Sequence, residues 1–257
     1  MRATSGQNSC REAIAAGLRE TGVLAGDTLL VHSSFKALGP VPGGIETVVQ
    51  GLLLAIGPEG TLLMPALSWA LRPPEVFDVR QTPSIVGAIT EYFRTREGTT
   101  RSLHPTHSVC AVGRRTHELL DDHRLDSTCC GPHSPFRKLT ETGGKIVMLG
   151  CGLGPNTTMH ALDECANHPC IFSGGTHLFT LRDTEGQTLR KEYRMHAYPG
   201  YAQRYERVAD IPHEAFLRQG RVLQATTYVL DAPGLRAAVL GKLQVDPFFF
   251  YQAHAQG

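Results

Sequence analysis

The chain has 257 residues and a formal net charge of +1, with 41% apolar and 19% charged residues. This balance excludes a disordered chain, which needs lower hydrophobicity and a stronger net charge. It also provides no overall field to attract nucleic acid, so we expect no nucleic-acid partner. No run of 18 or more apolar residues occurs, so we expect no membrane span and no membrane partner. The length suits one large domain, and we predict a single domain over residues 1–257.

The N-terminal half alternates helical and strand patterns. A capping box predicts a helix over residues 9–22. A short apolar run bounded by turn residues predicts a buried strand at residues 28–32. Helical periodicity follows at residues 45–56, a second strand is predicted at 61–66, and a second amphipathic helix at 85–93.

The C-terminal half continues the alternation and adds a hairpin. Strands are predicted at residues 107–113, 145–150 and 226–230, and a helix at 231–243. Two alternating runs flank a DTEG turn within residues 177–194, which predicts a β-hairpin. We therefore predict an α/β fold whose central mixed, mainly parallel sheet is flanked by helices. The hairpin is expected as an elaboration in the C-terminal third.

The seven cysteines are odd in number, and none forms a C-x-x-C pair. The N-terminus lacks the long apolar run of a signal peptide. In a chain without a leader, this pattern predicts reduced thiols and a cytoplasmic location.

A loop rich in glycine and proline follows the first predicted strand (residues 33–44). Open α/β sheets bind ligands beyond the carboxyl ends of their strands, and a helix N-terminus offers free N–H groups to an anion. The loop matches neither Walker A nor G-x-G-x-x-G. The residues alone leave two interpretations open, a site for an anionic or phosphate-bearing ligand and a plain turn.

The stretch NTTMHALDECANH places several titratable side chains within two helical turns. His160, Asp163 and Glu164 are spaced to meet on a helix, and a histidine beside a carboxylate suits acid–base chemistry. His160, Glu164 and His168 also follow one another at intervals of four, which is compatible with a metal site. His168 precedes Pro169, so the helix is expected to end before it. Spacing alone leaves three interpretations: an acid–base dyad, a metal site and a charged surface.

Six blocks occur in order along the chain: VHSSFKALGPVPGG, TLLMPALSW, TPSIVGAITEYFR, RSLHPTHSVCAVG, GPHSPFRKL and GLGPNTTMHALDE. Together they resemble the aminoglycoside 3-N-acetyltransferase family, the antibiotic N-acetyltransferases that use acetyl-CoA and lack the GNAT fold. The resemblance covers about residues 10–200. It implies an acyltransferase that moves the acetyl group of acetyl-CoA directly to an amine. The implied acceptor is the 3-amino group of an aminoglycoside, or a related amino sugar.

The resemblance also implies roles for individual residues. The family's catalytic histidine falls on His160, with Asp163 or Glu164 as its partner. Acetyl-CoA is expected against the loop after the first strand and the block RSLHPTHS, which supply His32, Ser33, Ser34, Lys36, Leu38, Gly39, Val41, Gly44, Arg101, Ser102 and Ser108. The acceptor is expected against Trp69, Asp78, His104, His107 and Asn156.

Acetyl transfer to an amine needs a neutral nucleophile and a stabilised carbonyl oxygen. His160 is expected to take the proton, while a carboxylate on its other ring nitrogen fixes its tautomer. Asp163 stands where the family usually has glutamate, and Glu164 follows it, so the partner stays open. Backbone amides of residues 33–44, or the Ser108 hydroxyl, are the candidate oxyanion donors.

Two features bear on the acceptor. The segment 66–81 is shorter than in many aminoglycoside enzymes, and the chain is nearly neutral. Because aminoglycosides are polycations, a site for them should be rich in carboxylates. A less charged amino sugar fits as well.

Two other classes compete with the transferase. One is a metal-dependent hydrolase that uses His160, Glu164 and His168. The other is a CoA-binding protein without activity. We expect a transferase with no metal and no covalent intermediate at Cys129 or Cys130, and a homodimer is compatible with the sequence.

Overall fold

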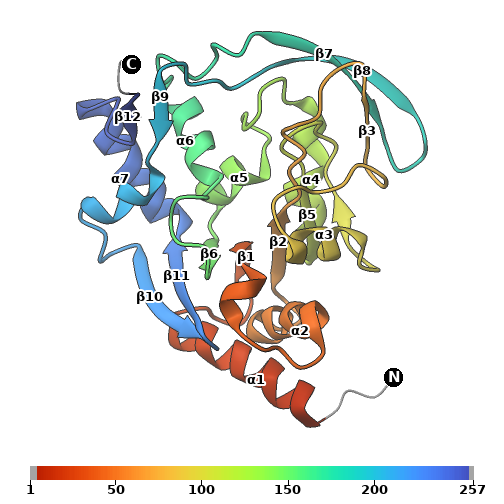
Figure 1. The fold of residues 1–257 in the computed structure, drawn as a ribbon, viewed down its shortest axis with the longest axis vertical. Coiled ribbons are helices and arrows are strands. Elements are labelled where there is room, and N and C mark those ends of the chain that lie inside the picture. Colours follow the sequence, from red (N-terminus) through yellow and green to blue (C-terminus); the bar gives the residue numbers. More distant parts are fainter. Residues whose placement is uncertain (1–4, 255–257) are drawn as a thin grey trace.

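The computed structural model describes residues 5–254, in which seven strands form a mixed sheet in the order β10-β11-β6-β1-β2-β5-β4 (Figure 1). Their bounds are β1 (Thr28–Ser33), β2 (Thr61–Pro65), β4 (Thr100–Arg101), β5 (Val109–Gly113), β6 (Lys145–Leu149), β10 (Leu217–Val222) and β11 (Ala225–Asp231). Strands β6, β1 and β2 are parallel neighbours. Strands β11 and β5 run antiparallel to the strands beside them. The predicted mixed sheet is confirmed. Within residues 5–254 its two central pairs are parallel, as predicted, but the four pairs toward its edges are antiparallel.

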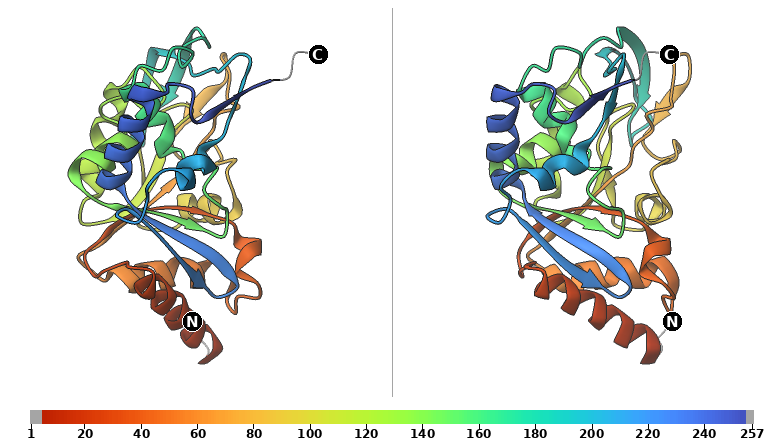
Figure 2. Two further views of the ribbon diagram at one scale, coloured as in Figure 1. Left: turned by 90° about the vertical axis from the view of Figure 1, so that its left-hand side faces the viewer. Right: turned by 60° about the vertical axis from the view of Figure 1, so that its left-hand side comes forward.

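Helices cover both faces of this sheet (Figure 2). They are α1 (Ser5–Glu20), α2 (Gly44–Ile56), α3 (Ala88–Thr95), α4 (Thr116–Leu120), α5 (Pro135–Thr142), α6 (Thr158–Cys165) and α7 (Ala232–Val245). Alternate residues of β1 face opposite cores, as a strand requires. Leu29 and Val31 pack with α1, α2 and α3, whereas Leu30 packs with α4, α5, α6 and α7.

A separate three-stranded sheet arches over one end of the molecule (Figure 1). It consists of β3 (Val76–Asp78), β7 (Thr176–Arg182) and β8 (Thr188–Arg194). Strands β7 and β8 form the predicted hairpin, and β3 pairs with β7 in parallel. A small core of its own, which includes Phe77, Phe179 and Tyr193, lies beneath it. The pairing fixes the segment 66–81 against the hairpin.

The chain after the hairpin returns toward α6. Strand β9 (Tyr201–Gln203) pairs with β12 (Tyr251–Ala253), and the 3₁₀ helix η3 (Tyr205–Asp210) follows β9. Two further 3₁₀ helices are η1 (Phe35–Leu38) and η2 (Asp121–Leu125). This return brings tyrosines from distant parts of the sequence close to one helix.

Several predicted bounds are corrected. Helix α1 includes residues 9–12, so the predicted capping box lies inside the helix. Helix α3 begins at Ala88 and not at residue 85, because Gly87 before it has φ of 132°. Helix α6 ends at Cys165, before Pro169 as predicted. Strand β10 was not predicted. Within residues 5–254, no helix combines the length and apolar character needed to cross a bilayer.

Candidate active site

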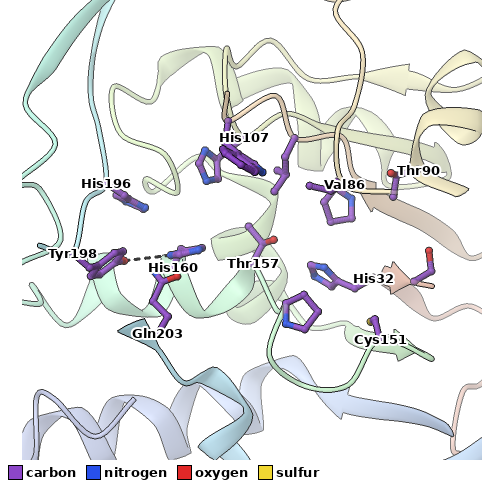
Figure 3. A pocket seen from close by; sticks show the side chains of 15 residues that line it. His32, Val86, Thr90, His107, Cys151, Thr157, His160, His196, Tyr198 and Gln203 are labelled. Atoms are coloured by element: carbon purple, nitrogen blue, oxygen red, sulfur yellow. Dashed lines mark hydrogen bonds between the residues drawn. The ribbon is translucent and has the colours of Figure 1, made fainter. Parts of the chain in front are cut away.

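A cavity of about 460 Å³ opens at the carboxyl ends of the parallel strands (Figure 3). His32 and Ser33 end β1, Pro65 ends β2, and Cys151 follows β6. This is the edge where open α/β sheets bind their ligands. The remaining lining residues come from loops, α3, α6 and the return segment: Leu67, Trp69, Val86, Thr90, His107, Pro155, Thr157, His160, His196, Tyr198 and Gln203.

Gly150 allows the chain to turn from β6 into this cavity. Its φ is 73°, a conformation that favours glycine. A Cβ atom there would lie 2.5 Å from that of Ala37 and 3.0 Å from that of Ala225. The sequence thus needs glycine at this point to place Cys151 in the cavity wall.

A second cavity of about 400 Å³ lies beneath the hairpin. Trp69, His107 and His196 line both cavities, so the two spaces share a wall. Arg72 and His177 also line the second cavity. Among the described residues that line either cavity, none is aspartate or glutamate.

His160 projects from α6 into the first cavity, and tyrosines hold one side of its ring. Its Nδ1 lies 3.0 Å from the Tyr205 hydroxyl and 3.3 Å from the Tyr198 hydroxyl. Both tyrosines donate to Oδ2 of Asp163, at 2.7 Å and 3.2 Å respectively. Tyr251 donates to the same oxygen. Three phenols therefore surround one buried carboxylate.

This network assigns the tautomer of His160. Each phenol has one proton, and Tyr205 and Tyr198 direct theirs to Asp163. Their oxygens can then only accept from His160, which requires a proton on Nδ1. The lone pair is left on Nε2.

Burial shapes the charges in this network. Burial lowers the pKa of His160 well below its usual range, and the charges of His196 and His107 lower it further. The ring is therefore neutral at physiological pH, with the Nε2 lone pair unprotonated. Burial raises the pKa of Asp163 to about 6, although its tyrosine hydrogen bonds oppose the rise.

Glu164, the next residue of α6, serves a different histidine. Its Oε1 accepts from His196 Nε2 at 2.6 Å and from the backbone N–H of Cys130 at 2.7 Å. Its Oε2 accepts from the Thr128 hydroxyl at 2.6 Å. The same histidine lies near the thiol of Cys129, which is 1% exposed.

The thiol and its histidines are strongly coupled. Burial raises the pKa of Cys129, but the neighbouring His107 and His196 outweigh it and lower the pKa to about 5. Burial lowers the pKa of His196, but the neighbouring Cys129 and the bond to Glu164 raise it to about 10. The thiol and His196 therefore each favour the charged form of the other.

The architecture matches known proteins. Residues 30–243 match the model of a family described as aminoglycoside 3-N-acetyltransferase. An aminoglycoside N(3)-acetyltransferase IV of Salmonella sp is 30% identical over 239 residues, which cover 91% of this chain and 87% of that protein. The chain belongs to the aminoglycoside 3-N-acetyltransferase family.

Other relatives of this family are similar over shorter or more divergent stretches. An aminoglycoside N(3)-acetyltransferase III of Salmonella sp is 35% identical over 178 residues, and the match spans 62% of each chain. The crystal structure of a histidine-to-alanine variant of the acetyltransferase AAC(3)-IVa in complex with a gentamicin has a TM-score of 0.80 at 26% identity. It covers 97% of this chain and 92% of that one. AAC-IIIb with CoASH has a TM-score of 0.79 at 27% identity, covering 91% and 96%.

The predicted dyad needs a correction. Among the described residues, His160 hydrogen-bonds to tyrosines and to neither carboxylate. Asp163 is fully buried on the inner face of α6 and reaches the histidine only through phenols. Glu164 is occupied by His196. The predicted partnership with Asp163 is therefore indirect, and that with Glu164 is absent.

The predicted donor residues of the family's first loop divide into two groups. His32 and Ser33 line the first cavity. Burial lowers the pKa of His32 to about 3, so its ring is neutral. Leu38 is fully buried in the core, and Val41 packs against that core. Ser34, Lys36, Gly39 and Gly44 are not among the described residues that line this cavity.

The residues of the block RSLHPTHS that were predicted to bind acetyl-CoA instead form hydrogen bonds within the protein. Arg101 is 7% exposed and donates to the carbonyls of Ala66 and Thr82. Ser108 donates its hydroxyl to Ala66, so it is not free as an oxyanion donor. Ser102 bonds His123. These three side chains are not among the described residues that line the first cavity, so the geometry does not support a direct contact with acetyl-CoA.

The residues that were predicted to bind the acceptor also divide into two groups, those that line the cavities and those that do not. Trp69 and His107 line both cavities. Asp78 accepts from the backbone of Arg80 and Gln81 and is outside the cavity lining. His104 and Asn156 have framework contacts. His104 is fully buried against the Thr128 carbonyl, and the Asn156 side chain accepts from the Thr158 N–H at the start of α6.

The three residues of the predicted metal site, His160, Glu164 and His168, do not meet. His160 faces the first cavity and Glu164 faces His196. His168 lies beyond the end of α6, with its ring 4.2 Å from that of Tyr251. The helix ends too early to place the three side chains on one face.

Sequence reasoning missed the tyrosines and His196. Tyr198, Tyr205 and Tyr251 come from loops and short elements that have no helical or strand periodicity. The aromatic run at residues 247–251 is, from its sequence, most simply core packing or an oligomer contact. The one available signal was the concentration of histidine and tyrosine in HAYPGYAQRY, directly after the hairpin.

Proposed function

We propose that the protein transfers the acetyl group of acetyl-CoA directly to an amine of an aminoglycoside or a related amino sugar, with His160 as general base. The observation that carries this proposal is the assigned tautomer. Nδ1 of His160 is held by Tyr205 and Tyr198, and the Nε2 lone pair belongs to a neutral ring in the cavity wall. A base in this state can take a proton from an attacking amine.

The loop after β1 offers a suitable seat for the donor. Gly43 and Gly44 begin α2 with φ of 81° and 67°, and open space lies beside Gly44. A helix N-terminus attracts phosphate through its free N–H groups. Lys36 is exposed on the same loop. The relative AAC-IIIb was solved with CoASH, which supports CoA as a ligand of this chain.

Asp163 acts behind the base as a positioning residue. When His160 takes a proton at Nε2, the ring becomes positively charged. The carboxylate of Asp163 stabilises this charge through Tyr205, whose hydroxyl bonds both groups. A buried hydrogen-bonded chain of this kind is electrostatically stronger than in water. Acetyl-CoA supplies the activated acyl group when it is bound.

The second cavity is the proposed acceptor side. It adjoins His160 through the shared wall at His107 and His196. Trp69 offers an apolar face for a sugar ring. Arg72 and the absence of carboxylates among the described lining residues oppose a highly cationic ligand. An amino sugar with few positive charges therefore fits this cavity better than a polycation.

The test is a thiol-release assay with acetyl-CoA against aminoglycosides that carry a free 3-amino group and against simpler amino sugars. We expect turnover of at least one of these amines, with the simpler sugars preferred. A kcat/KM near 10⁴ M⁻¹s⁻¹ or above is ordinary for an enzyme and its substrate (order of magnitude). Preference for aminoglycosides would overturn the argument from charge. Tight CoA binding without turnover of any amine would favour a binding protein over an enzyme.

A further inference from the structure

Three side chains from separate segments meet in the wall between the two cavities. They are His107 from the loop before β5, Cys129 from the loop after η2, and His196 from the segment after β8. One nitrogen of each histidine and the cysteine sulfur all lie within 4.8 Å of one another. Within residues 5–254, this is the one group of histidine, cysteine or acidic side chains with such geometry.

The cluster contains a ring nitrogen that is buried and unsatisfied. The His196 side chain is 7% exposed, and its Nδ1 is buried with no hydrogen-bond partner among the described residues. Its Nε2 is bonded to Glu164 at 2.6 Å. Such a nitrogen costs free energy unless something occupies it. The ring is therefore oriented with one nitrogen anchored and the other directed at the cluster.

The second histidine is oriented in a similar way. Nδ1 of His107 bonds the hydroxyl of Thr106 at 2.9 Å. His107 is 8% exposed and Cys129 is 1% exposed. Both histidines thus have one nitrogen bonded within the protein, and the other is left for a ligand.

We propose that His107, Cys129 and His196 bind one divalent transition-metal ion of the zinc type. Zinc takes cysteine sulfur at about 2.3 Å and histidine nitrogen at about 2.0 Å in tetrahedral geometry. Those lengths separate neighbouring ligand atoms by about 3.5 Å, so small side-chain rotations close the present set around an ion. Two nitrogens and one sulfur are ligands that select zinc over magnesium or calcium.

Glu164 holds His196 in place from the side away from the proposed metal ion. Histidines that bind metals commonly donate their other N–H to a carboxylate, which fixes the ring and raises its basicity. Glu164 has this place behind His196, and Thr128 and Cys130 hold it there. Zinc binds cysteine as a thiolate, so Cys129 and this carboxylate together would balance the charge of a dication.

The three protein ligands leave a fourth position for a small molecule. His107 and His196 line both cavities, and Cys129 lines the second. Water would complete the tetrahedron from that side. The site differs from the stripe of His160, Glu164 and His168, and it departs from the expectation of a protein without metal. It does not depend on the proposed acetyl transfer.

The test is a titration of chelator-treated full-length protein with Co²⁺, followed by Zn²⁺. We expect one equivalent of Co²⁺ to produce a thiolate-to-cobalt charge-transfer band and tetrahedral visible bands, and Zn²⁺ to abolish both. Cys129→Ser should lose the charge-transfer band. Cys170→Ser is the matched control, since Cys170 lies outside the cluster, and it should keep the band.

A second variant guards against a simple folding defect. Glu164→Gln keeps the side-chain shape, and loss of a supporting carboxylate of this kind lowers metal affinity by about 10- to 100-fold. Far-ultraviolet circular dichroism identifies the variants that are folded. Absence of cobalt binding to the wild type, or a charge-transfer band that survives in folded Cys129→Ser, would overturn the proposal. Neither outcome would affect the test of acetyl transfer, which is read from thiol release.

Discussion

Two neighbouring carboxylates on α6 enter two different networks. Asp163 lies among three phenols behind His160, whereas Glu164 lies among His196, Thr128 and Cys130. Successive residues of an α-helix point about 100° apart, so adjacent acids face different neighbours. One turn of helix thereby supports a general base on one side and a thiol–imidazole cluster on the other.

The two networks also differ in charge. Burial raises the pKa of Asp163 to about 6, because its hydrogen-bond donors are neutral phenols. Burial also acts to raise the pKa of Glu164, but its bond to His196 and the charge of that ring lower it overall. The first network can therefore gain a proton near physiological pH, and the second stays ionised. Four predictions test whether this division is real.

Among these four, the largest effect is expected from Asp163→Asn. The change removes the charge that stabilises protonated His160, and hydrogen bonds to charged groups contribute about 1.5–3 kcal/mol. We expect kcat in the thiol-release assay to fall by about 10- to 100-fold. The neighbouring variant Glu164→Gln is the matched control and should stay within about threefold of the wild type. Equal losses of kcat in both variants would contradict the division into two separate networks.

A smaller effect is expected from Tyr205→Phe. This variant removes the phenol that links His160 to Asp163, a single hydrogen-bonding group, so kcat should fall by about three- to tenfold. Tyr193→Phe is the control, because the Tyr193 hydroxyl is buried without a partner among the described residues. If both variants behave alike in steady-state kinetics, the relay through Tyr205 is not used.

The pH dependence should report Asp163 and not His160. The pKa of Asp163 is raised to about 6, so its carboxylate is present above that pH and is lost as the pH falls through it. The pKa of His160 lies well below its usual range, so the ring stays neutral over the same interval. We expect kcat/KM to have an acid limb near pH 6 in the wild type and to lack it in Asp163→Asn. The same acceptor is used for the wild type and the variant. If Asp163→Asn keeps the acid limb, the limb reports the titration of another group.

The smallest effect on turnover is expected from Thr128→Val. This variant removes a 2.6 Å hydrogen bond to Glu164 and leaves the Asp163 network untouched. Because Glu164 is ionised, we expect a loss of about 1.5–3 kcal/mol in stability, or about 3–12 °C in Tm for a chain of this size. Thermal unfolding measures this loss of stability. The kcat of the variant should differ from that of the wild type by less than twofold. A loss of turnover as large as that of Tyr205→Phe would place Glu164 in the catalytic network.

The sequence predicts the framework well because the framework is local. Strands β1, β2 and β6 are short apolar runs between turns, and α2 carries a continuous apolar stripe. Strand β10 was not predicted because its sequence, LRQGRV, is largely polar and lies at a sheet edge. Periodicity detects elements that bury one face, and it gives little signal for exposed edges.

The site was predictable only in part. His160 was found from its motif, and the loop after β1 was found from its glycines and its place beside a strand. The partners of His160 were not, since Tyr205 and Tyr251 lie 45 and 91 residues further along the sequence. The contacts of Cys129 with His107 and His196 also join distant segments. Only the folded chain shows that the acid at the i+3 position faces inward and reaches the base through tyrosines.

The most direct test of the central claim is the kinetics of His160→Ala beside His117→Ala, whose histidine is exposed on α4. We predict that His160→Ala binds CoA as tightly as the wild type in calorimetry but loses at least about 100-fold in kcat. His117→Ala should match the wild type in both. Turnover by His160→Ala near that of the wild type would contradict the assignment of this residue as the general base.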